Sequence, residues 1–589
     1  MIVTAGQATL TGALISRLGF LQLYKHKDYS IQSDSNSIEP IFRAAQRGVV
    51  YDRNGTALTQ NYERYQLFLY IESEKSAMEF VDTLCGVLNA SAKTRGEVSR
   101  KVLQARRRST VLLLDDLNWN DLSRIESSFY KLDGATIERQ VTRTCLFPYE
   151  MAHVIGYVSL PVKEDIENAK DLRPVFLSPG FRIGRSGVEK VYDEYLRGKY
   201  GVKYIEVNSL DRPIRIISEK EPSAGNNLAT TIDLELQKFA FNRLEGKVAS
   251  ATVLNVKTGE VLACVSTPSF DVNQFSEGIS QKYWDELNSD KRLPMHNRAL
   301  SAIYPPGSVF KVMTALAALE NGYDANHIVN CKGHTQYGNR KLHCWKKEGH
   351  GKLNLVEAIE KSCNIYFFEL AETLGIEKIN EVAKRFGYGQ DVDVELEGVS
   401  FGNLPTDKWK RKVFGKQWVG GDTLNCAIGQ GFVLATPFQV ALAMARFANG
   451  GYKIKPSFIK SAKSIDQIAS GDVKKIIKDE AHFKLINQGL NNVVNNKGGT
   501  AYYKRIVKEG FEMAGKTGTS QVVSKRDDEM SRSELRLRAN KNHAIFAGYA
   551  PVSNPKYAIS VVVEHGGSGS ATAAPMARDL LLKAQELAI

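Results

Sequence analysis

A serine and a lysine three residues apart form the first candidate site. Ser308 and Lys311 stand in the run S-V-F-K, which follows Y-P-P-G at 304–307 and precedes an Ala- and Leu-rich stretch. Proline followed by glycine predicts a turn, so we expect a helix to begin near Ser308 and to place both side chains on one face. A serine hydroxyl needs a base to become a nucleophile. Lysine can be that base if burial or a nearby cation lowers its pKa. The pair therefore predicts nucleophilic catalysis, and the N–H groups at the helix start can stabilise an oxyanion.

Two further motifs follow in the same half of the chain. Ser362 and Asn364 enclose one residue, and there a serine can relay a proton while an amide holds a substrate amide. The third motif is K-T-G-T at 516–519, where a strand is expected. Its glycine lets a substrate backbone lie against the strand edge. Lys516 offers a cation to a carboxylate, and Thr519 offers its hydroxyl to that carboxylate and its N–H to the oxyanion. Each motif alone is common, but the three in this order form a strong signal.

The elements that must position these motifs divide near residue 225, where P-S-A-G-N-N at 222–227 is typical of a linker. The first part contains short strands, turns and two amphipathic helical stretches, at 75–88 and 95–105. In the second part, apolar strands are expected near both ends, with helices between them. These strands are 251–256, 261–266, 544–549 and 557–563, and a final helix is expected at 578–588. This order predicts an α+β domain whose sheet joins the two ends of the second part.

Size and charge set the outer limits. A chain of 589 residues is too long for one compact domain, so two or more are expected. Its net charge of +13 suits an anionic partner, such as nucleic acid, membrane headgroups or cell wall. The longest basic run, at 106–108, has no aromatic residues interleaved. We interpret it as a solvated face and expect no nucleic-acid partner.

The first 24 residues leave two interpretations open. Residues 1–16 carry no charge, but Arg17 interrupts the apolar pattern, which then resumes at 18–24. This falls short of the roughly 18 to 20 apolar residues that a membrane span needs. The segment is either an amphipathic helix packed on the domain or the residual end of a membrane anchor.

The motifs together resemble the class B penicillin-binding proteins. R-G-V-V-Y-D-R-N-G at 47–55 is similar to the opening motif of their non-catalytic pedestal, and G-R-S-G-V-E-K at 184–190 to the segment joining pedestal and catalytic domain. L-P-T-D-K-W-K at 404–410 and the stretch at 422–437 resemble the elongation-type subgroup, penicillin-binding protein 2. The resemblance covers residues 20–589. It implies a dimerisation-type pedestal at 25–225 and, at 226–589, the penicillin-binding transpeptidase fold, an antiparallel sheet with helices. No glycosyltransferase domain precedes the pedestal, so glycan polymerisation is not expected.

The resemblance also implies a mechanism and roles for the motif residues. Ser308, deprotonated by Lys311, attacks the penultimate D-Ala carbonyl of a stem peptide and expels the terminal D-Ala. An amine from a neighbouring stem then resolves the acyl-enzyme. Ser362 relays the leaving-group proton and Asn364 holds the donor peptide. The substrate-binding strand supplies Lys516, Thr517, Gly518 and Thr519, and penicillins acylate Ser308 because they mimic D-Ala-D-Ala.

A cysteine and histidine cluster accompanies the second motif. The chain has seven cysteines, an odd number with irregular spacing that does not indicate a disulfide framework. Cys331, Cys344, His350 and Cys363 form C-x12-C-x5-H-x12-C. Zinc takes cysteine and histidine ligands tetrahedrally, and the resemblance implies a metal site in this region. The alternatives are a Cys331–Cys344 disulfide with Cys363 as a core thiol, or His334 or His343 as a substitute ligand.

The expected biology follows from the family. It implies an inner-membrane protein with a periplasmic catalytic domain, acting in cell elongation and shape. It also implies a membrane glycosyltransferase partner and a scaffold that contacts the pedestal. A D,D-carboxypeptidase shares the acyl-enzyme and differs only in its acceptor. A β-lactamase needs no pedestal, whereas a β-lactam sensor should carry several membrane spans and an effector domain.

Overall fold

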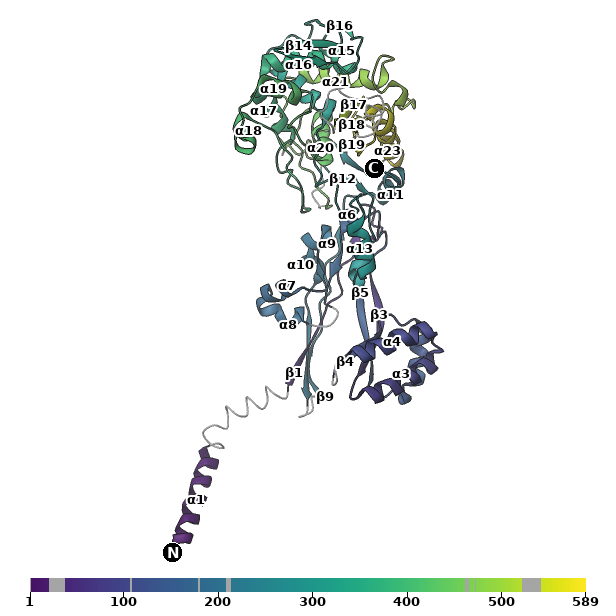
Figure 1. Cartoon of the computed structure of the whole chain (residues 1–589), viewed down its shortest axis with the longest axis vertical. Helices are drawn as coiled ribbons and strands as arrows, with labels where there is room; N and C mark the ends of the chain where they lie inside the picture. Colours follow the sequence, from purple (N-terminus) through teal and green to yellow (C-terminus); the bar gives the residue numbers. More distant parts are fainter. Residues whose placement is uncertain are drawn as a thin grey trace.

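A computed structural model describes residues 2–20, 38–105, 109–177, 181–207, 213–460, 466–471, 473–521 and 542–588. The basic run at 106–108 lies outside these residues. Figure 1 shows an elongated molecule, with the second part of the chain forming one end and the first part extending away from it.

A five-stranded sheet organises the second part. Its order is β12-β11-β19-β18-β17, and every neighbouring pair is antiparallel. The strands are β11 (Ala249–Asn255), β12 (Val261–Thr267), β17 (Ala514–Ser520), β18 (His543–Ala550) and β19 (Tyr557–Val563). Strands from the two ends of the domain therefore lie side by side, because β11 pairs with β19. The predicted α+β class, and a sheet that joins the two ends, are confirmed.

Helices bury both faces of this sheet. Figure 1 places α20 (Pro437–Ala448) on one side and α11 (Leu234–Arg243) with α23 (Ala574–Leu587) on the other. Every residue of α20 is buried, as expected of a central helix whose residues are almost all apolar. Asp233 caps α11, because its side chain accepts the Leu236 N–H. The remaining helices of this part are α12 (Asn273–Glu277), α13 (Gln281–Ser289), α14 (Lys311–Glu320), α15 (Leu355–Glu360), α16 (Asn364–Leu374), α17 (Ile376–Phe386), α18 (Asp407–Phe414), α19 (Gly420–Ala427) and α21 (Glu480–Asn495).

The first part of the chain has two arms. In one arm, the long antiparallel strands β3 (Thr59–Tyr70) and β5 (Ala135–Cys145) carry β4 (Thr110–Leu114) and a helical head with its own apolar core. The head contains α3 (Glu74–Leu88), α4 (Ala92–Gln104) and α5 (Trp119–Ser127). The other arm is the sheet of β1 (Ile38–Arg43), β8 (Gly201–Val207) and β9 (Pro213–Lys220). The helices predicted at 75–88 and 95–105 correspond to α3 and α4.

The motifs at 47–55 and 184–190 meet at the junction between the two parts of the chain. Glu189 from the second motif is almost fully buried and accepts from Arg47 of the first at 2.7 Å and from Arg143 at 2.7 Å. The two guanidinium groups hold the pKa of Glu189 below its usual value against the effect of burial. Gly48 cannot carry a side chain, since a Cβ there would lie 1.9 Å from the Asn226 carbonyl oxygen. The short elements of the first part and its link to the second are β2 (Val50–Tyr51), α6 (Ala152–Ile155), β6 (Val158–Ser159), α7 (Lys163–Asn168), α8 (Arg173–Phe176), β7 (Ile183–Gly184), α9 (Gly187–Val191), α10 (Asp193–Arg197) and β10 (Leu228–Ala229).

Helix α1 (Ile2–Gly19) begins the described chain. The side chains of residues 11–18 are exposed, so this stretch does not pack against either arm. Among the described residues, no helix combines the length and the apolar character needed to cross a bilayer.

Candidate active site and cysteine–histidine cluster

Ser308 lies on a tight turn that directly precedes α14. The turn is a 3₁₀ helix, Gly307–Val309, so the α-helix begins at Lys311 and not at the serine. Gly307 has a φ of +56°, and its N–H donates to the Gly429 carbonyl at 2.8 Å. A Cβ on Gly307 would lie 2.8 Å from the Thr519 carbonyl oxygen. Glycine is therefore required where the nucleophile's turn meets β17, which brings the first and third motifs together.

Lys311 connects the first motif to the second. Its side chain is fully buried, and Nζ donates to the Ser362 carbonyl at 2.9 Å and to Asn364 Oδ1 at 2.8 Å. Ser362 Oγ lies 3.4 Å from the same nitrogen. Burial lowers the pKa of Lys311 to about 8, because an ammonium ion is costly away from water. The neutral amine is thus accessible near neutral pH, as a base for Ser308 requires.

The second motif turns sharply into α16. Ser362 has a φ of +54°, an uncommon left-handed conformation for a residue with a side chain. Asn364 is the first residue of α16 and donates through Nδ2 to the His343 carbonyl at 3.3 Å. The turn places the Ser362 hydroxyl and the Asn364 amide oxygen next to the same atom, Lys311 Nζ.

The third motif lies on β17, at the edge of the sheet. Lys516 is fully buried, and its pKa is lowered well below the usual value by burial and then by the charge of Lys311. The hydroxyl groups of Thr517 and Thr500 are 2.8 Å apart. A Cβ at Gly518 would meet the Pro306 carbonyl oxygen at 3.0 Å.

Gln430 is a further residue at this site that the motifs did not single out. Its Nε2 donates to the Thr519 carbonyl at 2.8 Å, while its neighbour Gly429 accepts from the turn that carries Ser308. Residues 429–430 therefore hold the turn that carries Ser308 and strand β17 together. They lie in the 422–437 stretch, whose sequence resembled the family but gave no signal for this contact.

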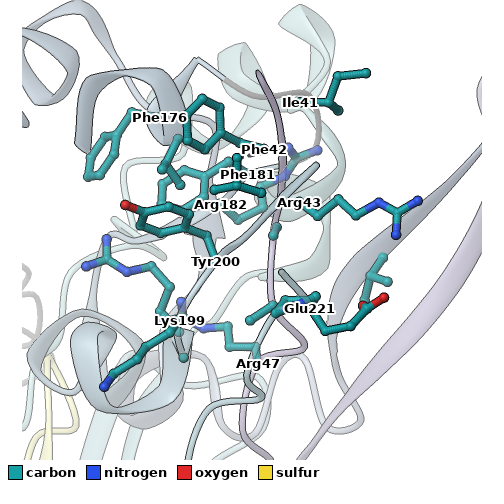
Figure 2. Close-up of a pocket in the computed structure, with 18 of the residues that line it drawn as sticks. Ile41, Phe42, Arg43, Arg47, Phe176, Phe181, Arg182, Lys199, Tyr200 and Glu221 are labelled. Carbon is teal, nitrogen blue, oxygen red and sulfur yellow. Dashed lines mark hydrogen bonds between the residues drawn. The ribbon is translucent and has the colours of Figure 1, made fainter. Parts of the chain in front are cut away.

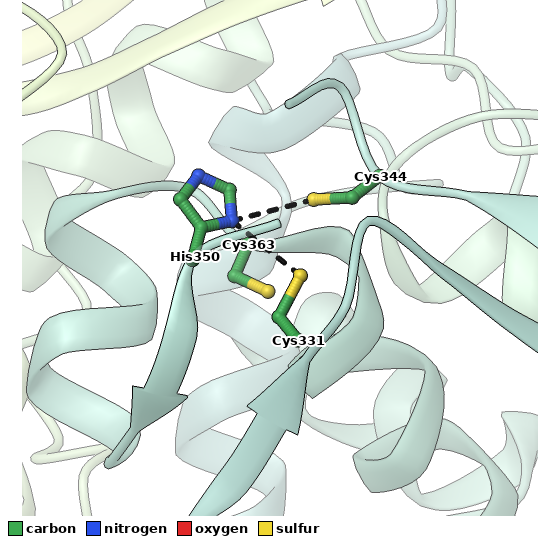
Figure 3. A group of neighbouring side chains, drawn as sticks. All are labelled: Cys331, Cys344, His350 and Cys363. Carbon is green, nitrogen blue, oxygen red and sulfur yellow. Dashed lines mark hydrogen bonds between the residues drawn. The ribbon is translucent and has the colours of Figure 1, made fainter. Parts of the chain in front are cut away.

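The four predicted metal ligands converge beside the second motif (Figure 3). The ligand atoms of Cys331, Cys344, His350 and Cys363 all lie within 4.8 Å of one another. His350 Nδ1 is 3.6 Å from the Cys331 sulfur and 3.5 Å from the Cys344 sulfur. His334 and His343 face each other across the hairpin of β14 (His334–Tyr337) and β15 (Arg340–His343) and are not in this group.

The donor set of this cluster fits a tetrahedral metal such as zinc. All seven cysteines are free thiols, so Cys331 and Cys344 form no disulfide here. A hydrogen bond shared by Cys344 and Cys363 lowers the pKa of Cys344 and raises that of Cys363. Close thiols that compete for one proton are the arrangement that a bound cation relieves. The cluster adjoins β13 (Val329–Cys331) and β16 (Gly351–Leu353), which pair with each other.

Comparison with known proteins decides the family. Residues 249–582 match the model described as the penicillin-binding protein transpeptidase domain, and residues 42–230 match the penicillin-binding protein dimerisation domain. The peptidoglycan D,D-transpeptidase MrdA of Escherichia coli K12 is 31% identical over 579 residues, covering 97% of this chain and 91% of that protein. The chain belongs to the class B penicillin-binding proteins of the PBP2 type. The family inferred from the motifs is confirmed.

Solved PBP2 structures share the whole architecture. A complex between PBP2 and MreC from Helicobacter pylori superposes with a TM-score of 0.79 at 28% identity, covering 93% of this chain and 99% of that one. A structure described as the coordination of polymerization and crosslinking by a peptidoglycan synthase complex gives a TM-score of 0.73 at 27% identity. It covers 98% of this chain and 97% of that one. The similarity therefore extends through the pedestal as well as the catalytic domain.

A partly open cavity of about 1220 Å³ lies between the two arms of this PBP2-type pedestal. Figure 2 shows aromatic side chains gathered on its wall, among them Phe42, Phe176, Phe181 and Tyr200. Basic side chains, including Arg43 and Arg182, lie beside them. No residue of the three catalytic motifs lines this cavity, so it is a second surface of the molecule and not part of the active site.

Proposed function

We propose that this chain is a peptidoglycan D,D-transpeptidase and a target of penicillins. The observation that carries the proposal is the buried Lys311, which lies three residues after Ser308 and is hydrogen-bonded to both Ser362 and Asn364. This arrangement provides a nucleophile, a base with a lowered pKa and a second hydroxyl for proton transfer. The relative of known activity matches over nearly its full length.

The first half-reaction forms the acyl-enzyme. Neutral Lys311 takes the proton of Ser308 Oγ as this oxygen attacks the carbonyl carbon of the penultimate D-Ala. The backbone N–H groups of Ser308 and Thr519 stabilise the oxyanion. The C–N bond then breaks, and Ser362 passes the proton from the lysine to the amine of the departing D-Ala.

The second half-reaction forms the cross-link. The amine of an acceptor stem attacks the ester carbon, its proton passes to the lysine, and the bond to Ser308 Oγ breaks as this oxygen regains a proton. Asn364 holds the donor peptide throughout. Before the first step, Lys516 and the Thr519 hydroxyl bind the terminal carboxylate of the donor. The donor then lies along β17, which also contains Thr517 and Gly518.

We further propose that Cys331, Cys344, His350 and Cys363 hold a structural zinc ion. Three neighbouring free thiols can pair as a disulfide in an oxidising compartment, and metal coordination would prevent this pairing. The ion would supply only structural cross-linking between β13, the end of β15 and the second motif. The chemistry of Ser308 requires no cofactor.

The pedestal and the relatives support a place in side-wall elongation and cell shape. The catalytic domain would act in the periplasm, anchored to the inner membrane. By similarity to the solved complexes, the partners would be a membrane glycosyltransferase and an MreC-like scaffold. We propose that the scaffold contacts the pedestal cavity, whose aromatic wall suits an apolar partner segment.

A substitution at the cavity rim tests the scaffold proposal. Ile41 lines the cavity on β1 and is half exposed, so Ile41→Asp should leave the fold intact. We expect it to weaken binding of the MreC-like scaffold from the same bacterium at least about tenfold in a titration. Ile216→Asp is the matched control, because Ile216 is similarly exposed on β9 but does not line the cavity. Equal affinity for both variants would exclude this surface.

Covalent labelling tests the enzymatic proposal. The protein is incubated with benzylpenicillin, its intact mass is measured, and the modified peptide is sequenced. We expect one adduct per chain, located on Ser308, because the ring amide replaces the scissile peptide bond. The absence of an adduct, or an adduct on another residue, would overturn the assignment.

A further inference from the structure

Residues 343–345, at the end of β15 and in the loop that follows it, contact the second catalytic motif. The His343 carbonyl accepts from Asn364 Nδ2 at 3.3 Å, and the Cys344 sulfur accepts from the Asn364 N–H at 3.4 Å. Trp345 Nε1 donates to the carbonyls of Lys361 and Ser362, each at 3.1 Å. Residues 343–345 therefore lie along the motif: His343 binds the Asn364 side chain, whereas Cys344 and Trp345 bind backbone groups.

The carbonyl of Ser362 is the point where this loop meets the catalytic base. It accepts from Lys311 Nζ at 2.9 Å and from Trp345 Nε1 at 3.1 Å. Ser362 is buried and holds a φ of +54°. Such a conformation persists only when surrounding contacts fix it. The two donors on one carbonyl are such contacts, since rotation of this peptide would break both.

The indole of Trp345 contributes little to the core. Its side chain is 58% exposed, and its ring centroid lies 5.2 Å from that of His350. A ring this exposed contributes little hydrophobic stabilisation. The main contact of Trp345 is therefore the hydrogen bond from its N–H to the second motif. Its loop is short and held at both sides, because Cys344 and His350 belong to the cysteine–histidine cluster.

We propose that Trp345 is a positioning residue for acylation: its indole N–H fixes the Ser362 peptide, which in turn places Ser362 Oγ and Lys311 Nζ for proton transfer. This inference rests on the proposed transpeptidase function. Trp345 acts through Ser362 and makes no bond to the reacting atoms. Its effect should therefore appear in the chemical step and not in the initial binding of the penicillin.

The test removes the N–H group in two ways. Trp345→Phe keeps an aromatic ring, and replacement of Trp345 by benzothienylalanine keeps the bicyclic shape with sulfur in place of N–H. Stopped-flow acylation by a chromogenic penicillin-type substrate separates the acylation rate constant from the dissociation constant of the first complex. We expect both variants to lose about three- to tenfold in the rate constant, with a change of less than about twofold in the dissociation constant.

Trp284→Phe is the matched control, since Trp284 is also partly exposed but lies on α13, outside the three motifs. The control should acylate like the wild type. An unchanged rate constant in the benzothienylalanine protein would overturn the inference, because then the N–H has no role. A loss confined to the dissociation constant would also overturn it and indicate direct contact with the ligand. Absence of acylation in the wild type would contradict the proposed function itself and not the role of Trp345.

Discussion

Lys311→Met is expected to slow acylation of Ser308 by penicillin about a thousandfold, the range typical of a lost general base. Methionine has a similar length and suits the buried site, but it cannot take the serine proton. It also removes the donor that the Ser362 carbonyl and Asn364 Oδ1 now share. The rate is measured by intact-mass kinetics, with Ser308→Ala as the blank that cannot form the ester.

Two controls separate the loss of the base from other effects. Lys311→Arg restores the positive charge but not the base, because guanidinium stays protonated at all accessible pH values. It should be as slow as Lys311→Met. Thermal unfolding of both variants reports whether the buried site still folds. If the Lys311→Met protein folds and acylates within about tenfold of the wild type, Lys311 is not the general base.

The same lysine sets the pH dependence of the wild type. Burial lowers the pKa of Lys311 to about 8, and only the neutral form accepts a proton. The acylation rate should therefore rise about tenfold per pH unit below this value and level off above it. Lys311→Met should lose this rise, since its residual rate no longer depends on that titration.

Much of this site could be predicted from the sequence because its parts are local. Each part can be identified from a few consecutive residues: a turn before a helix, a serine three residues before a lysine, and a strand that contains glycine. The sheet was also predictable, since its strands are apolar and lie near both ends of the domain. The apolar strands near the start of the domain and those near its end must be buried in one sheet. This requirement favours the pairing of β11 with β19.

Contacts between distant segments were not predictable in the same way. The sequence indicates nothing of the bond from Gln430 to the Thr519 carbonyl, or of the indole N–H of Trp345 beside Ser362. Each depends on a side chain reaching a backbone carbonyl across the fold, and such pairs carry no pattern. The start of α14 at Lys311 is a further example, because the approach of Gly307 to β17 imposes a tighter turn at Ser308.

Cys363→Ser is expected to abolish binding of the proposed zinc ion, lower the thermal stability and slow acylation about 10- to 100-fold, as loss of a group that supports a site commonly does. Cys363 is fully buried and stands between Ser362 and Asn364, so a change at this ligand acts directly on the residues that bind Lys311. Zinc per chain is measured by inductively coupled plasma mass spectrometry, alongside the melting temperature and the acylation rate. Cys85→Ser is the control, because Cys85 lies in the pedestal helix α3 and should alter none of the three.

Chelation of the wild type provides the second arm of this experiment. When the free metal concentration is a thousand times the dissociation constant, binding stabilises the folded state by about 4 kcal/mol. A strong chelator should therefore lower the melting temperature, and added zinc should restore it.

The competing disulfide makes the opposite prediction. If Cys331 and Cys344 were bonded, thiol titration of the unfolded protein without reductant would find two fewer than the seven cysteines of the chain. Zinc would be absent, and chelation would leave the melting temperature unchanged. A protein with all seven thiols and one zinc ion would instead show that the loop beside Ser362 is held by a metal.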